Sequence, residues 1–168
     1  MTNTNERADL LSALEKHRGF LRQTLQGITD DQARTRTTVS ELCLGGIVKH
    51  VTRVEQGWTG FIERGAEAMS GGTDPEAIKA HLEGFQMLPG ETVSGLLERY
   101  GSAAAGTADV VNILPSLDVA HRLPEAPWFE RTEWSARRVL LHILAETAQH
   151  AGHADIIREA LDGAKTMG

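Results

Sequence analysis

The chain has 168 residues, a formal net charge of −6, and a composition of 40% apolar and 24% charged residues. This length suits one domain with a sizeable core, and the composition is typical of a folded globular protein rather than a disordered one. No block of lysine and arginine provides the positive footprint of a nucleic-acid-binding protein. No run approaches the roughly 18 consecutive apolar residues of a membrane span. We therefore expect neither nucleic acid nor a membrane as a partner.

The first residues and the single cysteine predict a cytoplasmic setting. The chain starts with polar residues and lacks the apolar segment of a secretion signal. Cys43 has no second cysteine with which to form a disulfide within the chain. A reducing compartment is the usual location of such a chain. Cys43 itself is predicted to be a small buried side chain, with a reactive thiol as the alternative.

Two long amphipathic segments occupy the first part of the chain. The first runs from about residue 5 to 26 and the second from about 38 to 65, with apolar residues three and four apart. Residues 28–37 between them are mostly polar and predict turns. Thr38 and Glu41 have the spacing of a capping box, in which a hydroxyl and a carboxylate satisfy unpaired backbone amides. The second helix is therefore predicted to begin near Thr38.

Two further helices are predicted in the second part, at about residues 91–114 and 134–161. Pro115 ends the first of them, because proline cannot continue a helix. The segment 66–90 is less regular and includes a predicted short helix from Pro75 to Leu82.

No segment alternates apolar and polar residues as a half-buried strand would. The sequence therefore predicts an all-α fold, a four-helix bundle with two longer connections at 66–90 and 115–133. We expect residues 1–168 to form a single domain.

The fourth predicted helix carries several titratable side chains on one face. His142, Glu146 and His150 follow one another at intervals of four residues, and His153 lies close to the same face. Apolar neighbours such as Ile143 predict that this face points into the bundle or into a cleft. A carboxylate buried there without compensation would cost several kcal/mol. A divalent cation would stabilise it, because metal ligands must be deprotonated.

A ligand from a facing helix would complete such a metal site, and His50 is the candidate. It lies between Ile47 and Val54, on the apolar face of the second helix. His50, Glu146 and His150 would form a set of two histidines and one carboxylate, with open positions for water or substrate. That set suits catalytic zinc, and also Fe(II), Ni(II) or Mn(II). Nitrogen ligands without a thiolate favour Zn²⁺.

Each of these residues also has another interpretation. Glu146 and His150 also fit a surface pair at helical spacing. His153 is interpreted as a fourth ligand, a group that holds Glu146, or a substrate contact. His142 stands about 12 Å along the axis from His150, so it is expected to support the site rather than to bind the same ion. Gly152 weakens a helix and predicts the close approach of a neighbouring helix or ligand.

Two stretches resemble the DinB-like superfamily. GGIVKHV at residues 45–51, followed by EQGW at 55–58, resembles the second helix of that family. VLLHILAETAQHAGHADI at residues 139–156 resembles its fourth helix. The similarity is greatest to the actinobacterial branch that includes mycothiol S-transferases.

The resemblance implies a four-helix bundle that binds a divalent metal through His50, Glu146 and His150. Many relatives have histidine at the position of Glu146, whereas thiol-dependent maleylpyruvate isomerases share the His/Glu/His pattern. Those isomerases carry an additional C-terminal domain for which we expect no counterpart here, and this argues against isomerase activity. Relatives often dimerise through helix faces, so the resemblance also implies a homodimer.

These features favour a metal-dependent S-transferase that conjugates mycothiol to electrophilic small molecules in detoxification. The metal would lower the pKa of the thiol and so provide a thiolate at neutral pH. His153 is the candidate catalytic residue, as acceptor of the thiol proton, with a water on the metal as the alternative. Other hypotheses are a metal-dependent hydrolase or isomerase, a non-enzymatic metal- or ligand-binding stress protein, and a purely structural bundle.

Overall fold

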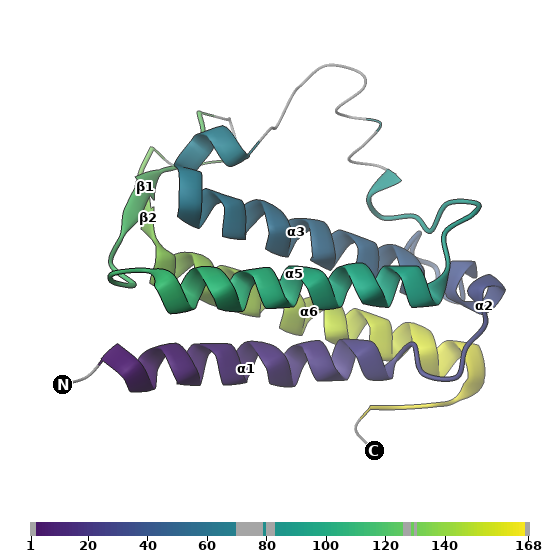
Figure 1. Cartoon of the computed structure of the whole chain (residues 1–168). Helices are drawn as coiled ribbons and strands as arrows, with labels where there is room; N and C mark the ends of the chain where they lie inside the picture. The colour runs from purple at the N-terminus through teal and green to yellow at the C-terminus, as the bar shows by residue number, and fades with distance from the viewer. Residues whose placement is uncertain (1–2, 70–78, 80–82, 126–128, 130, 167–168) are drawn as a thin grey trace.

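Four long helices lie side by side in the computed structural model, which describes residues 3–69, 79, 83–125, 129 and 131–166 (Figure 1). Among these residues the regular structure is otherwise limited to short elements. The predicted all-α four-helix bundle is therefore confirmed. The four helices are α1 (Asn3–Gln23), α3 (Leu44–Arg64), α5 (Val93–Ile113) and α6 (Ala136–Asp162).

The bundle has an up-down-down-up order, because α3 and α5 run in the same direction while α1 and α6 run in the opposite one (Figure 1). Helix α3 has 21 residues, which corresponds to a length of about 32 Å. The chain must return over this length before α5 can begin parallel to α3. The long connection predicted at 66–90 is thus a consequence of topology. The 3₁₀ helix η1 (Gly65–Ala68) lies at the start of this connection.

The second long connection contains a short β-hairpin, so the prediction that no strand is present was wrong. Strand β1 (Ala120–Arg122) pairs antiparallel with β2 (Glu133–Ser135) at one end of the bundle. Each strand has only three residues, which is too short for an alternating pattern to stand out in the sequence. The fourth helix consequently begins at Ala136 rather than at Trp134, and the Ser135 hydroxyl caps it by accepting from the Arg138 amide.

The predicted start of the second helix at Thr38 was also wrong. Helix α3 begins at Leu44, with the Cys43 sulfur accepting a hydrogen bond from the Gly46 amide at 3.4 Å. The side chain of Val39 is fully exposed, so a helix extended back to Thr38 would gain nothing from its burial. Cys43 is buried, as predicted.

A capping box does occur between α1 and α3, but it lies nine residues before the predicted one. Thr29 and Gln32 form it at the start of α2 (Asp30–Arg34), within a stretch predicted to consist of turns. The predicted short helix at 75–82 lies almost wholly outside the described residues. Among the described residues, no helix combines the length and apolar character that crossing a bilayer requires.

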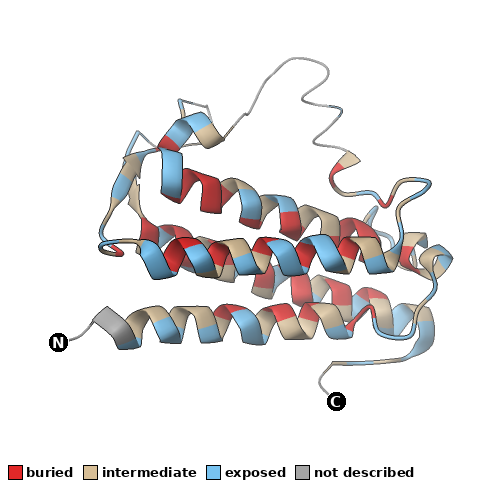
Figure 2. Ribbon diagram, in the orientation of Figure 1, coloured by how far each residue is buried: buried red, intermediate tan, exposed pale blue. Residues whose placement is uncertain are grey.

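Two apolar clusters fill the interior, and red segments in Figure 2 mark the helix faces that contribute to them. One cluster includes Leu21, Val51 and Ala151, whereas the other includes Leu14 and Phe61. Along each long helix, the two clusters are separated by polar residues. The buried polar residues at this level include Arg18, Glu55, Thr59, Thr107 and Thr147, with at least one from each long helix.

An ion pair within this polar layer links three of the helices. The Arg18 guanidinium donates to both carboxylate oxygens of Glu55, and the Thr107 hydroxyl donates to Oε1 of Glu55 at 2.6 Å. Arg18 is 3% exposed and Glu55 is 0% exposed. Separating the pair would leave a buried charge without a partner, which is strongly destabilising. The ion pair and the Thr107 hydrogen bond together therefore hold α1, α3 and α5 in one register.

Close contact between the first turn of α3 and the loop at residues 83–92 depends on two glycines. A Cβ atom on Gly46 would overlap the carbonyl of Phe85, and one on Gly45 would overlap the side chain of Met87. Only glycine allows the loop to lie directly on the helix here. By contrast, a Cβ atom on Gly57, further along the same helix, would have open space.

The substitutions Gly46→Ala and Gly57→Ala are expected to act in opposite directions. Gly46→Ala must displace loop backbone and should lower the free energy of unfolding by about 1–3 kcal/mol. Gly57→Ala should raise it by up to about 1 kcal/mol, because alanine favours the helix and meets no clash. Urea denaturation measures both values. Equal stabilisation by the two substitutions would contradict the close approach of the loop.

Candidate metal centre

The antiparallel contact between α3 and α6 brings together the three side chains predicted to bind a metal. Nε2 of His50 lies 4.0 Å from Oε2 of Glu146, and Nε2 of His150 lies 3.6 Å from the same oxygen. One ligand atom from each residue falls within 4.8 Å of the other two. Glu146 and His150 are one turn apart on α6, whereas His50 comes from the facing helix.

The three side chains lie at the boundary between the core and solvent. His150 is buried, while His50 and Glu146 are partly exposed. The exposed fractions are 16% for the His50 side chain and 30% for that of Glu146. The site therefore combines an apolar inner side with an outer side that is partly exposed to solvent.

The chemistry of this donor set fits a divalent cation. Zinc bound tetrahedrally by nitrogen and oxygen ligands at about 2.0–2.1 Å places neighbouring donor atoms roughly 3.4 Å apart. The separations of Glu146 Oε2 from His50 and His150, 4.0 and 3.6 Å, are close to that value. Small side-chain movements would bring all three donors into the coordination range. Three protein ligands leave a fourth position for a reacting group.

Burial keeps two histidines of α6, His142 and His150, in the form that binds metals. It lowers the pKa of His150, an effect that Glu146 opposes and that the neighbouring His153 reinforces. Burial likewise lowers the pKa of His142, against Glu146 and together with Arg138. With pKa values below about 6.5, both imidazoles are neutral at pH 7. A neutral imidazole offers a nitrogen lone pair to a cation.

His142 supports Glu146 from the side opposite the other histidines. Its Nε2 atom lies 3.9 Å from Oε1 of Glu146, the carboxylate oxygen that does not face His50 and His150. The His142 ring packs edge-on against Trp58 and Trp134 at centroid distances of 4.8 and 5.3 Å. His142 therefore belongs to the surroundings of the site, as its distance along the helix predicted.

His153 lies next to His150 rather than next to Glu146. Its Nδ1 atom is 3.5 Å from Nδ1 of His150, at the limit of hydrogen-bonding distance. This nitrogen of His150 is not the one nearest the carboxylate. His153 is therefore placed to influence the tautomer and orientation of His150.

Two features of the site differ from the sequence-based interpretation. Gly152 is exposed and a Cβ atom there would have open space, so the predicted close approach of a neighbour within the chain was wrong. Phe85 was not identified, although its ring stacks on His50 at a centroid distance of 4.1 Å. The adjacent glycines 45 and 46 were the available signal for a segment packed against α3.

The four helices form a bundle of the DinB-like class. Comparison with known families assigns the chain further: the mycothiol S-transferase family matches residues 9–163. The chain therefore belongs to the mycothiol S-transferase family, and it is an enzyme of the mycothiol-dependent S-transferase class.

Other comparisons bear on the fold alone. A crystal structure of a conserved protein from Enterococcus faecalis superimposes with a TM-score of 0.70 and 11% sequence identity, covering 98% of this chain and 100% of that one. At this identity the similarity concerns only the arrangement of helices. Among curated proteins, no sequence matches the chain significantly.

The neutral histidines make the stability of the metal-free protein dependent on pH. Their pKa values are lower in the folded state than in the unfolded state, so the unfolded state binds more protons as the pH falls. The contribution of these neutral histidines to the free energy of unfolding is fully present above about pH 6.5. It is lost as the pH falls through their folded-state pKa values. We expect the free energy of unfolding to decrease from about pH 7.5 to about pH 5.5, and to decrease less in His150→Gln. An identical pH dependence in the variant would contradict the pKa shift of His150.

Proposed function

We propose that the protein transfers mycothiol to electrophilic small molecules in a reaction that depends on a divalent metal held by His50, Glu146 and His150. The convergence of three donor atoms within 4.8 Å, in a chain of this family, carries the proposal. Zn²⁺ is the proposed metal, because two imidazoles and one carboxylate suit it well; Ni²⁺, Mn²⁺ and Fe²⁺ are the alternatives.

The chemistry divides between the cation and the protein. A bound divalent cation supplies positive charge that lowers the pKa of a nearby thiol and favours the thiolate at neutral pH. His50 and His150 provide neutral donors, and Glu146 offsets part of the positive charge. His142 and the two tryptophans around it limit the movement of Glu146. The partly exposed outer side of the site admits the thiol and the electrophile.

His153 is proposed as the residue that transfers the proton of the thiol, and its contact with His150 defines which of its ring nitrogens takes part. If His150 coordinates through Nε2, its Nδ1 carries a proton that can be donated to Nδ1 of His153. Neutral His153 then has its own proton on Nε2. The Nδ1 lone pair of His153, which this long contact of 3.5 Å engages only weakly, accepts the proton of the thiol. The imidazolium so formed then gives that proton to the group that leaves the electrophile as the carbon–sulfur bond forms, which returns His153 to its neutral form.

Detoxification in the cytoplasm is the setting we propose for this reaction. A low-molecular-weight thiol persists in reduced form in a reducing compartment. Conjugation to such a thiol removes the reactivity of an electrophile. Association into a homodimer is retained as a prediction of the resemblance.

Metal analysis and a conjugation assay test the proposal together. Purified wild-type protein should contain about one equivalent of divalent metal and conjugate mycothiol to an electrophile such as a haloaromatic compound. His150→Ala should lose metal and most of the activity, by about 10²-fold or more, because a three-ligand site loses one ligand. His17→Ala is a matched control, since His17 packs against Phe20 on α1 and should leave both properties unchanged.

The same assay separates the alternatives. Turnover of a substrate without any thiol would indicate a metal-dependent hydrolase or isomerase, for which the open coordination position is equally suitable. Metal binding without turnover of any electrophile would indicate a binding protein. Full conjugation activity in metal-free wild-type protein would contradict the proposed role of the metal.

A further inference from the structure

The loop at residues 83–92 covers one face of the His50 imidazole. The ring of Phe85 stacks on that imidazole with a centroid distance of 4.1 Å and an angle of 21° between the planes. The ring of His150 contacts His50 edge-on, at 4.8 Å and 69°. Rotation of the imidazole about its Cβ–Cγ bond would break the stacked contact. The plane of the His50 ring is therefore set by a residue outside the helices that carry the proposed ligands.

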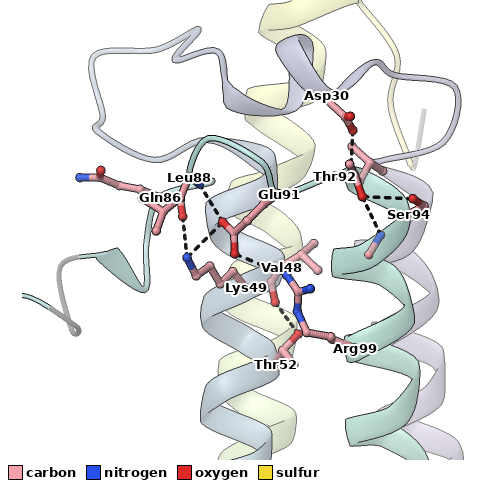
Figure 3. A network of polar contacts seen from close by, with 12 residues as sticks. Asp30, Val48, Lys49, Thr52, Gln86, Leu88, Glu91, Thr92, Ser94 and Arg99 are labelled. Atoms are coloured by element: carbon pink, nitrogen blue, oxygen red, sulfur yellow. Dashed lines mark hydrogen bonds and ion pairs between the residues drawn. The ribbon is translucent and has the colours of Figure 1, made fainter.

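A partly buried carboxylate, that of Glu91, anchors this loop to the turn of α3 that carries His50 (Figure 3). Oε2 of Glu91 accepts from the Leu88 amide at 2.7 Å and from Nζ of Lys49 at 3.1 Å. Arg99 on α5 donates to Oε1 of Glu91 at 3.4 Å. Lys49 directly precedes His50 in the chain and also donates to the backbone carbonyl of Gln86, next to Phe85, at 3.3 Å.

Further contacts fix both margins of the loop. At its end, the Val93 amide donates to Oδ1 of Asp30 at 2.7 Å, and Arg34 donates to the carbonyl oxygen of Glu91 (Figure 3 shows the Asp30 contact). At its start, the glycines of the first turn of α3 allow the backbone around Phe85 to lie directly on the helix. The loop thus has polar anchors on α2, α3 and α5.

Glu91 is ionised at neutral pH, as the anchor requires. Partial burial alone would raise the pKa of Glu91, but the hydrogen bond from Leu88 and the charges of Lys49 and Arg99 outweigh it. The net result is a pKa below the ordinary value for glutamate. Charge-assisted hydrogen bonds of this kind are stronger than those between neutral groups.

We propose that Phe85 is a positioning residue for the metal site, which through the loop anchored by Glu91 fixes the plane of the His50 imidazole so that Nε2 points toward Glu146 and His150. The inference rests on the proposed metal-dependent function, because it assigns His50 as a ligand. An imidazole already held in its binding orientation loses less conformational freedom when a cation binds. His50 needs this support, since it is the one proposed ligand from α3.

The first experiment measures ring geometry without metal. Proton NMR of the metal-free protein should show His50 ring protons shifted upfield by the ring current of Phe85. Phe85→Leu keeps an apolar side chain but removes the aromatic ring, so the shift should disappear. Glu91→Gln should reduce it while Phe85 remains present. Phe20→Leu is the matched control, because Phe20 contacts a different histidine, His17, and should leave the His50 signals unchanged.

The second experiment measures Zn²⁺ affinity by competition with a chelator. Phe85→Leu should weaken binding roughly three- to tenfold, the factor that corresponds to the loss of one aromatic pair. Glu91→Gln should weaken binding in the same direction. The double variant should lose less than the sum of the two effects, because both residues act through one contact. Phe20→Leu should bind as the wild type does, and circular dichroism should show all four variants folded.

Unchanged Zn²⁺ affinity in folded Phe85→Leu would overturn the inference, even if the wild type binds the metal tightly. An additive loss in the double variant would overturn the role of Glu91 as the anchor through which Phe85 acts. Wild-type protein that binds no Zn²⁺ refutes the proposed function instead. In that case the ring-current experiment alone decides whether Phe85 orders His50: loss of the shift in Phe85→Leu and in Glu91→Gln supports that part of the inference, and its persistence overturns it.

Discussion

The antiparallel contact of α3 with α6 is the constraint on which the rest of the site depends. Two ligands on one helix can be placed by their spacing of four residues, but the third must come from another helix at the same level. A shift of one turn, about 5.4 Å, would remove His50 from reach of Glu146. The buried ion pair of Arg18 and Glu55 restricts such shifts, because α3 cannot slide along α1 without separating the two charges.

The site has to satisfy two opposing electrostatic requirements. The imidazoles must remain neutral in order to bind a cation, and burial achieves this by lowering the pKa of His150. A carboxylate buried without compensation is costly, and the side chain of Glu146 avoids this cost because it is 30% exposed. Placing the ligands at the edge of the core meets both requirements. It also explains why these titratable residues have apolar neighbours in the sequence and yet remain partly exposed in the structure.

Local spacing made much of the fold and of the proposed site predictable. The long helices followed from apolar periodicity, and the pairing of Glu146 with His150 followed from a four-residue interval. The start of α3 was missed because Thr38 and Glu41 match a capping pattern, whereas the apolar segment that α3 buries begins only at Leu44. Contacts of a loop with a distant helix were not predictable in this way. Phe85 and His50 are 35 positions apart in the sequence, and nothing in the loop's own pattern specifies that they meet.

The central claim is that His50, Glu146 and His150 bind one metal ion together, and anomalous diffraction from crystals grown with Zn²⁺ tests it most directly. The account predicts a single strong anomalous peak at the zinc edge, within about 2.0–2.2 Å of Nε2 of both histidines and of a carboxylate oxygen of Glu146. A peak at surface side chains alone, or no peak between α3 and α6 in zinc-saturated crystals, would contradict it.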